Sequence, residues 1–258
     1  MTLVQGLLKS LAITAPILMG TAAPAQQGPI VLLKLDDVTA ASPRWRRTAE
    51  FLAQEGVKAN FGVIGQALEK EDPALKEWVT ALHKSGRIEF WNHGYATPFQ
   101  KDEAKGIRGE FLGNSFENQL QALKRTQELG RLRFGITFAA FGPHSSGMDD
   151  NTFRALAEIP EIKAVFSPGM PRVATAGSVF MIQRRIELEK PIFNPNPDAV
   201  RERFEQIAKT VDYLSFQGHP NQWDDAKFAN FQQAVRYLKE QGCRFMTVSE
   251  FLAQPNKK

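Results

Sequence analysis

Short apolar runs alternate along this chain with longer segments in which apolar residues recur every three or four positions. The runs are typical of strands buried in a sheet, and the longer pattern is typical of amphipathic helices. The runs predict eight strands, at residues 30–35, 57–64, 87–91, 136–141, 162–166, 178–182, 211–216 and 244–248. Because helical lengths separate most of them, the sequence predicts an α/β protein with seven or eight parallel strands in a barrel.

The helical segments show a single buried face and defined ends. One such face consists of Leu75, Trp78, Val79 and Leu82. A glycine follows several segments at the place where a left-handed residue ends a helix, namely Gly56, Gly86, Gly130 and Gly242. Five prolines between Pro168 and Pro197 predict that this part of the barrel is irregular.

Residues suited to catalysis follow four of the predicted strands. They form the segments Asp36-Asp37, Asn92-His93, Gly142-Pro143-His144 and Gln217-Gly218-His219. In barrels and open parallel sheets, catalytic groups gather at the carboxyl ends of the strands. Aspartate and histidine are also the side chains that a hydrolytic metal centre requires. We therefore expect the four segments to converge on one site.

The first 25 residues have the pattern of an export signal. Lys9 provides a positive start, residues 11–20 a short apolar core, and Ala23-Pro24-Ala25 a cleavage site. The apolar core is shorter than a membrane-spanning helix requires, although an uncleaved anchor is the alternative. We expect one catalytic domain at residues 26–258, exported to the periplasm or secreted, with no membrane span after cleavage.

Composition and motifs disfavour several other classes of protein. The formal net charge is +4, and basic residues are interspersed with acidic ones, which indicates no binding of nucleic acid. Neither a P-loop nor a G-x-G-x-x-G motif follows a strand, and no G-x-S-x-G motif is present, so a nucleotide-binding protein and a serine hydrolase are disfavoured. Cys243 is the only cysteine, which excludes an intrachain disulfide.

The four segments that follow strands resemble the motifs of the polysaccharide deacetylase family, also called the NodB-homology or carbohydrate esterase family 4 proteins. They also occur in the same order along the chain as those motifs. Lys34–Asp37 resembles the family's first motif, (S/T)-F-D-D, and His93–Pro98 resembles the second, H-(S/T)-x-x-H-P. Phe141–His144 is similar to a third motif, R-x-P-(Y/F), and His219 looks like the family's late histidine. The resemblance spans about residues 30–250 and implies a distorted TIM-like (β/α) barrel.

The resemblance implies a divalent metal ion, most simply zinc, bound by Asp37 and His93. The family's other metal-binding histidine falls at Thr97, which is a poor ligand. His144 also follows a strand and is either a substitute metal ligand or a hydrogen-bonding loop residue. Bound at one carboxylate, the metal would activate water and leave the neighbouring carboxylate free to act as a base.

The resemblance also implies the acid and the base. Asp36 would take a proton from the attacking water, and His219 would protonate the departing amine. The family's arginine that orients the base is replaced by Phe141, so Arg184 or Arg185 would take over that task.

On the substrate side, we expect contacts from Tyr95, Pro143 and Trp223, with the indole of Trp223 able to stack on a sugar ring. Gln217 occupies the place of an apolar residue that contacts the acetyl methyl group in the family. Residues 161–170 contain no aspartate for the family's fourth motif.

The resulting hypothesis is a metal-dependent hydrolase that removes acetyl groups from an N-acetylated or O-acetylated polysaccharide. A catalytically degenerate relative that only binds carbohydrate is the second interpretation, motivated by Thr97 and Phe141. A metal-dependent amidase acting on a small non-sugar amide would use the same residues and is the third.

Overall fold

The computed structural model describes residues 28–96, 102, 104, 106–144, 147–167, 179–183 and 185–255. The predicted export signal lies outside these ranges, as do Thr97, Arg184 and the side chain of Arg185. Export therefore stays a prediction. Within the described ranges, no helix is long and apolar enough to cross a bilayer.

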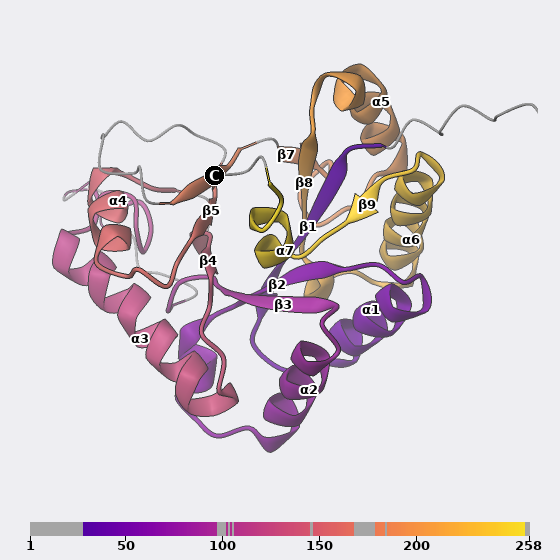
Figure 1. The fold of residues 1–258 in the computed structure, drawn as a ribbon. Coiled ribbons are helices and arrows are strands. Elements are labelled where there is room, and N and C mark those ends of the chain that lie inside the picture. The colour runs from indigo at the N-terminus through magenta and orange to yellow at the C-terminus, as the bar shows by residue number, and fades with distance from the viewer. Residues whose placement is uncertain are drawn as a thin grey trace, which may run out of the picture.

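In the described residues, nine strands form one sheet in which every pairing is parallel. They are β1 (Ile30–Val38), β2 (Ala59–Val63), β3 (Ile88–Asn92), β4 (Ala140–Phe141), β5 (Ala164–Phe166), β6 (Phe180–Ile182), β7 (Arg185–Glu187), β8 (Tyr213–Gly218) and β9 (Arg244–Phe245). Eight of them follow the order β6-β5-β4-β3-β2-β1-β8-β7, and β9 pairs with the start of β1. The sheet curls into a half-barrel (Figure 1), which confirms the predicted fold class.

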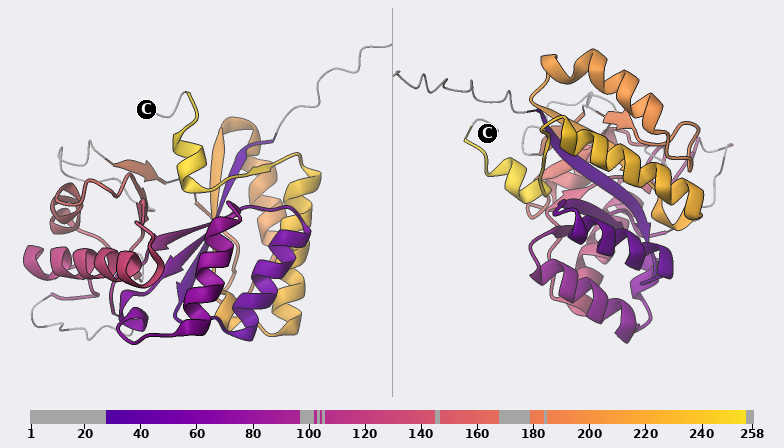
Figure 2. Two further views of the ribbon diagram at one scale, coloured as in Figure 1. Left: turned by 60° about the horizontal axis from the view of Figure 1, so that its bottom comes forward. Right: turned by 90° about the vertical axis from the view of Figure 1, so that its right-hand side faces the viewer.

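Helices cover the outer face of the curled sheet. They are α1 (Pro43–Gln54), α2 (Pro73–Lys84), α3 (Phe116–Phe134), α4 (Asp150–Ala157), α5 (Pro197–Ile207), α6 (Asp225–Glu240) and α7 (Val248–Leu252). The side chains of Ser42, Asp72 and Ser115 accept hydrogen bonds from backbone N–H groups in the first turns of α1, α2 and α3. Figure 2 shows that α7 differs from the others, because it lies at the end of the sheet where β1 begins.

The end of α3 differs from the prediction. Gly130 does not end the helix, which continues to Phe134 and closes at Gly135, where φ is 72°. A Cβ atom at Gly130 would lie 2.5 Å from the ring of Phe138. Gly130 therefore allows a close approach inside a helix, a role that the sequence pattern does not distinguish from that of a terminal glycine.

The irregular part of the barrel contains a strand that the sequence analysis missed. β7 has only three residues and follows β6 after two intervening positions. It pairs with β8, so that Glu187 lies opposite Gln217. β4 is also shorter than predicted, because only Ala140 and Phe141 of the expected 136–141 pair with neighbours. Three-residue strands are too short to show a periodic pattern.

The interior of the half-barrel is apolar at the amino ends of the strands. Ile30 and Leu32 form a cluster there with Val248 and Phe251 of α7, which closes this end, and the cluster extends to Trp91 and Phe166 near the carboxyl ends of β3 and β5. The intervening residues of β1, such as Leu33 and Leu35, pack against the outer helices instead. Because side chains alternate along a strand, the inward row of Ile30 and Leu32 continues with Lys34 and Asp36 toward the opposite end.

Candidate active site

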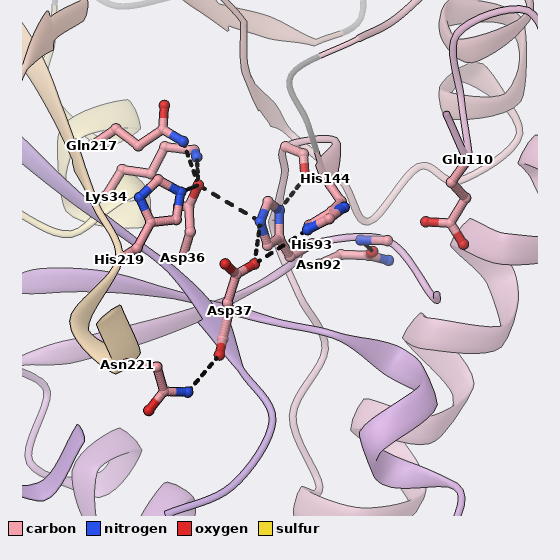
Figure 3. A network of polar contacts seen from close by, with 12 residues as sticks. Lys34, Asp36, Asp37, Asn92, His93, Glu110, His144, Gln217, His219 and Asn221 are labelled. Carbon is pink, nitrogen blue, oxygen red and sulfur yellow. Dashed lines mark hydrogen bonds and ion pairs between the residues drawn. The ribbon is translucent and has the colours of Figure 1, made fainter. Parts of the chain in front are cut away.

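The carboxyl end of β1 brings two adjacent carboxylates into the mouth of the half-barrel (Figure 3). Asp36 is 1% exposed, whereas the side chain of Asp37 is 26% exposed. Asp37 has φ 73°, a left-handed conformation that costs about 1–3 kcal/mol outside glycine. The Asn221 side chain donates a 3.4 Å hydrogen bond to the backbone carbonyl of Asp37. The unusual backbone accompanies an Asp37 side chain that faces the histidines following β3 and β4.

His93, directly after β3, faces both carboxylates. Its Nδ1 lies 2.7 Å from the carbonyl oxygen of Gly142, which can only accept, so Nδ1 carries a proton. Its Nε2 lies 3.2 Å from Asp37 Oδ1 and 3.6 Å from Asp36 Oδ2. In the neutral ring, Nε2 is an acceptor, and two acceptors facing each other require a proton or a cation between them. A histidine that donates its other N–H to a backbone carbonyl is also the usual arrangement of a metal ligand.

His144 approaches the same oxygen of Asp37. Its Nε2 lies 3.8 Å from Asp37 Oδ1, and its ring centroid lies 5.6 Å from that of His93. Burial and the neighbouring His93 lower the pKa of His144, against the opposing effect of the two aspartates. This favours the neutral imidazole that binds metals.

Asp37, His93 and His144 fit a divalent metal ion. The part of the chain that the structure describes contains no three His, Cys, Asp or Glu side chains already gathered closely around one point. However, neighbouring ligands of a tetrahedral zinc with bonds of about 2 Å lie only about 3.3 Å apart. Asp37 Oδ1 is buried and accepts no hydrogen bond from the described residues. Burial would raise the pKa of Asp37, but the close approach of His93 and the other histidines lower it to about 2.

Asp36 is held through one of its two oxygens. Lys34 Nζ contacts Asp36 Oδ2, and Gln217 Nε2 donates to the same oxygen at 2.7 Å. Asp36 Oδ1 is buried and accepts no hydrogen bond from the described residues. Lys34 also lies over the Trp91 ring, with Nζ 4.9 Å from the centroid. The carboxylate is thus fixed by two donors while its second oxygen stays available.

Lys34 was not among the predicted site residues, and the sequence indicated Arg184 or Arg185 for this cation. The side chains of both arginines lie outside the described residues. A signal for Lys34 was present, because residues two apart on a strand point to the same face. Gln217 likewise contacts the aspartate, in place of the apolar side chain that the family pattern suggests.

His219, after β8, lies on the other side of Asp36. Its Nε2 is 3.9 Å from Asp36 Oδ2, and its Nδ1 is 2.6 Å from Glu189 Oε2. Burial disfavours the imidazolium, but the hydrogen bond to Glu189 and the charges of nearby carboxylates outweigh this and raise the pKa of His219. A histidine with its proton retained at higher pH is suited to act as an acid.

Glu189 is the second residue that the sequence analysis missed. This carboxylate is 6% exposed and accepts hydrogen bonds from the backbone N–H groups of Phe193 and His219. It also accepts a 2.7 Å hydrogen bond from the indole N–H of Trp223. Glu189 follows the short β7, in the irregular region where no motif was recognised.

The predicted substrate contacts lie differently from what the sequence suggested. Trp223 is fully buried, so its ring has no face for a sugar and supports Glu189 instead. Pro143 is also buried. Tyr95 is partly exposed, and its hydroxyl donates to Glu69 Oε1 at 2.8 Å. Tyr95 lines a cavity of about 530 Å³ together with Glu110.

Glu110 holds the backbone just beyond His93. Its carboxylate accepts hydrogen bonds from the N–H groups of Tyr95 and Ala96, and Glu110 is only 5% exposed. Gly94 lies against it with φ 82°, and a Cβ atom there would come within 2.2 Å of Glu110 Oε2. The position that holds Ser or Thr in the family's second motif is therefore restricted to glycine in this chain.

We expect Glu110→Gln to stabilise the protein at pH 8 and to flatten its pH dependence. Burial raises the pKa of Glu110 from 4.5 to about 7, although the two backbone hydrogen bonds lower it. Because the folded-state pKa is the higher one, the stability from this group is present below about pH 4.5 and is lost as the pH rises through about 7. The loss is on the order of 3 kcal/mol.

Urea unfolding at pH 5 and pH 8 measures this difference. Glu77→Gln, at an exposed position on α2, is the matched control and should leave the pH dependence as it is. If the free energy of unfolding changed equally between pH 5 and pH 8 in Glu110→Gln and in the parent protein, the raised pKa of Glu110 would be contradicted.

Paired aspartates and three histidines gather at the carboxyl edge of a curled parallel sheet, an arrangement that suits hydrolytic chemistry in a distorted barrel. Residues 23–160 match the sequence model of the family described as Polysaccharide deacetylase. The chain therefore belongs to the polysaccharide deacetylase family. Members of this family are typically metal-dependent. No curated protein matches the chain.

Solved structures with the same fold share little sequence with this chain. A mutant of a carbohydrate esterase family 4 pseudoenzyme from Bacillus anthracis, with restored enzymatic activity, is 18% identical over 90% of this chain and 70% of its own, with a TM-score of 0.60. A family 4 acetyl xylan esterase from Clostridium thermocellum in complex with a cobalt ion is 16% identical over 86% of this chain and 90% of its own, also with a TM-score of 0.60. A family 4 carbohydrate esterase from Streptomyces lividans in complex with acetate is 16% identical over 84% and 91%, with a TM-score of 0.57. At these identities the likeness establishes the fold.

Proposed function

We propose that the protein is a metal-dependent hydrolase that removes acetyl groups from an N-acetylated or O-acetylated polysaccharide. The observation that carries the proposal is the placement of Asp36. Its Oδ2 lies 3.6 Å from His93 Nε2 on the side of Asp37 and His144 and 3.9 Å from His219 Nε2 on the other side, while its Oδ1 accepts no hydrogen bond from the described residues. We further propose that the protein acts outside the cytoplasm, since residues 1–25 have the pattern of an export signal.

In this proposal, Asp37, His93 and His144 hold the metal ion. A bound ion would supply Lewis acidity toward the acetyl carbonyl and would make water more acidic. Asp36 takes the proton of the attacking water on Oδ1, since Lys34 and Gln217 occupy Oδ2. His219 gives its Nε2 proton to the departing nitrogen or oxygen as the bond to the acetyl carbon breaks. The products are acetate and the free amine or hydroxyl of the sugar.

Acetate release from chitin oligomers, peptidoglycan and acetylated xylan tests the proposal. We expect release that a chelator stops and that added zinc or cobalt restores. Release without any dependence on metal would contradict the mechanism. Activity on small non-sugar amides alone would move the assignment to an amidase that uses the same residues.

We expect zinc affinity to fall at least about a hundredfold in Asp37→Ala, His93→Ala and His144→Ala. Each of these side chains supplies one of the three atoms that approach one another in the site. Isothermal titration with zinc measures the affinity without requiring catalysis. His83→Ala, at an exposed position on α2, is the control and should bind zinc as the parent does. Full affinity in His144→Ala would remove His144 from the ligand set.

A non-catalytic carbohydrate-binding protein is the second candidate. Thr97 at the place of a metal-binding histidine favours it, and a family 4 pseudoenzyme is among the structural relatives. This candidate predicts oligosaccharide binding that neither a chelator nor zinc changes. The zinc titration and the acetate assay together separate the two candidates.

A further inference from the structure

Two neighbouring apolar side chains are exposed at the edge of the proposed active site. Among the described residues, the large hydrophobic side chains that are exposed are Leu132, Ile192 and Phe193. Ile192 is 60% and Phe193 36% exposed. Both lie in the loop of residues 188–196, which joins β7 to α5. Single exposed apolar residues are common, but an adjacent pair beside a catalytic group indicates a contact surface.

Phe193 lies directly against the proposed acid. Its ring centroid is 4.9 Å from that of His219, and the two rings are inclined at 83°. Its backbone N–H donates a 3.0 Å hydrogen bond to Glu189 Oε2, the same oxygen that lies 2.6 Å from His219 Nδ1. Phe193 therefore packs directly beside the imidazole whose Nε2 we propose to deliver the proton.

The backbone of Phe193 adopts a conformation that a bulky residue rarely takes. Its φ is 67°, in the left-handed region, which costs about 1–3 kcal/mol outside glycine. The loop holds this conformation through hydrogen bonds between Lys190 and Asn194 and from Asn194 to Pro191, and through a bridge between Glu189 and Pro195. Glycine would fit this backbone without strain, so the presence of an exposed phenyl ring calls for a reason beyond folding.

We propose that Phe193, together with Ile192, forms the subsite that holds the apolar face of the sugar ring on the leaving-group side of the scissile bond. The departing atom must lie within reach of His219 Nε2, so the sugar that carries it must lie near the Phe193 ring. A pyranose presents a face of C–H groups that packs on an aromatic ring without requiring a charge. Two side chains are enough to cover one sugar ring. They are too few for a stable protein–protein interface, which buries about 800 Å² of surface on each partner.

This inference rests on the proposed function and assigns to Phe193 the stacking contact that the buried Trp223 cannot make. Phe193→Gly tests it, because glycine removes the ring and relieves the backbone strain at the same time. We expect the melting temperature of this variant to be equal to or above that of the parent. We expect its KM for the hexamer of N-acetylglucosamine or for acetylated xylohexaose to rise about five- to tenfold, more than for a single acetylated sugar. Leu132→Ala is the control, since Leu132 is equally apolar and 63% exposed but lies on α3.

NMR titration of the parent and of each variant with the same two hexamers measures binding affinity and does not depend on catalysis. If the parent binds a hexamer but releases no acetate, the proposed function fails, while weaker binding by Phe193→Gly still supports the subsite. Equal affinity of Phe193→Gly, Leu132→Ala and the parent would overturn the inference. So would the absence of hexamer binding by the parent, or a KM that rises equally for the hexamer and the single sugar.

Discussion

Asp36→Asn lowers the rate of acetate release by about a hundred- to ten-thousandfold, which is the largest effect that we expect from a single substitution. Asparagine keeps the shape of the side chain but cannot take a proton from water, and a positioned base contributes about 10²–10⁴ in rate. The zinc affinity should remain, because the proposed metal ligands Asp37, His93 and His144 do not include Asp36. The kcat for acetate release from the oligosaccharide measures the loss.

Stability must be measured alongside, since Asp36 is also the partner of the buried Lys34. We expect Asp36→Asn to cost about 2 kcal/mol, because it removes the carboxylate that the buried Lys34 contacts. The double variant Lys34→Met, Asp36→Asn removes both charges and should recover stability but no activity. Recovery of both would mean that the single variant failed by unfolding and that Asp36 is not the base.

Glu189→Ala is expected to lower both stability and activity. Four donors lose their acceptor together, namely the N–H groups of Phe193 and His219, His219 Nδ1 and the Trp223 indole. Removing one partner of a buried charge pair costs about 3–5 kcal/mol. We expect kcat/KM to fall at least about a hundredfold, since His219 loses the group that fixes its ring. Urea unfolding and acetate release measure the two effects.

Glu189→Gln distinguishes the effect of the Glu189 charge on the His219 ring from the effect of the space that the side chain fills. Glutamine has nearly the same volume but no charge, so the pKa of His219, which Glu189 raises, should fall. Because the acid must hold its proton, the alkaline limb of the pH–rate profile should move to lower pH. Glu187→Gln, two residues away and exposed, is the control and should keep the profile of the parent. An unshifted limb in Glu189→Gln would show that Glu189 does not act through His219.

The residues at the ends of the predicted strands indicated most of the candidate site. Asp36, His93 and His219 follow long or strongly apolar runs, so their convergence could be predicted from the rule that parallel strands end at one edge. Lys34 could also have been found, because it lies two residues before Asp36 on the same strand. The family pattern has an arginine in this role, and it therefore pointed to Arg184 and Arg185 instead of Lys34.

Other features lay beyond the reach of sequence reasoning. Glu189 follows β7, which is too short for a periodic signal. The burial of Trp223 depends on its packing against Phe231 of α6, a contact between residues whose spacing alone does not reveal it. Gly130 appeared to end a helix, because the sequence does not show the approach of Phe138. In each case a tertiary contact decided the outcome.

The closure of the amino end of the half-barrel by α7 affects which substitutions this protein can tolerate during evolution. α7 packs on the start of β1 at one end, while the left-handed Asp37 and the two aspartate oxygens that accept no hydrogen bond from the described residues lie at the other. The apolar packing of α7 on the sheet is therefore separate from the residues that we propose to perform chemistry. Substitutions at the catalytic edge can remove activity, and even relieve strain, without unfolding the protein. Such a division allows active enzymes and inactive binding proteins to share one scaffold and to be separated by only a few substitutions.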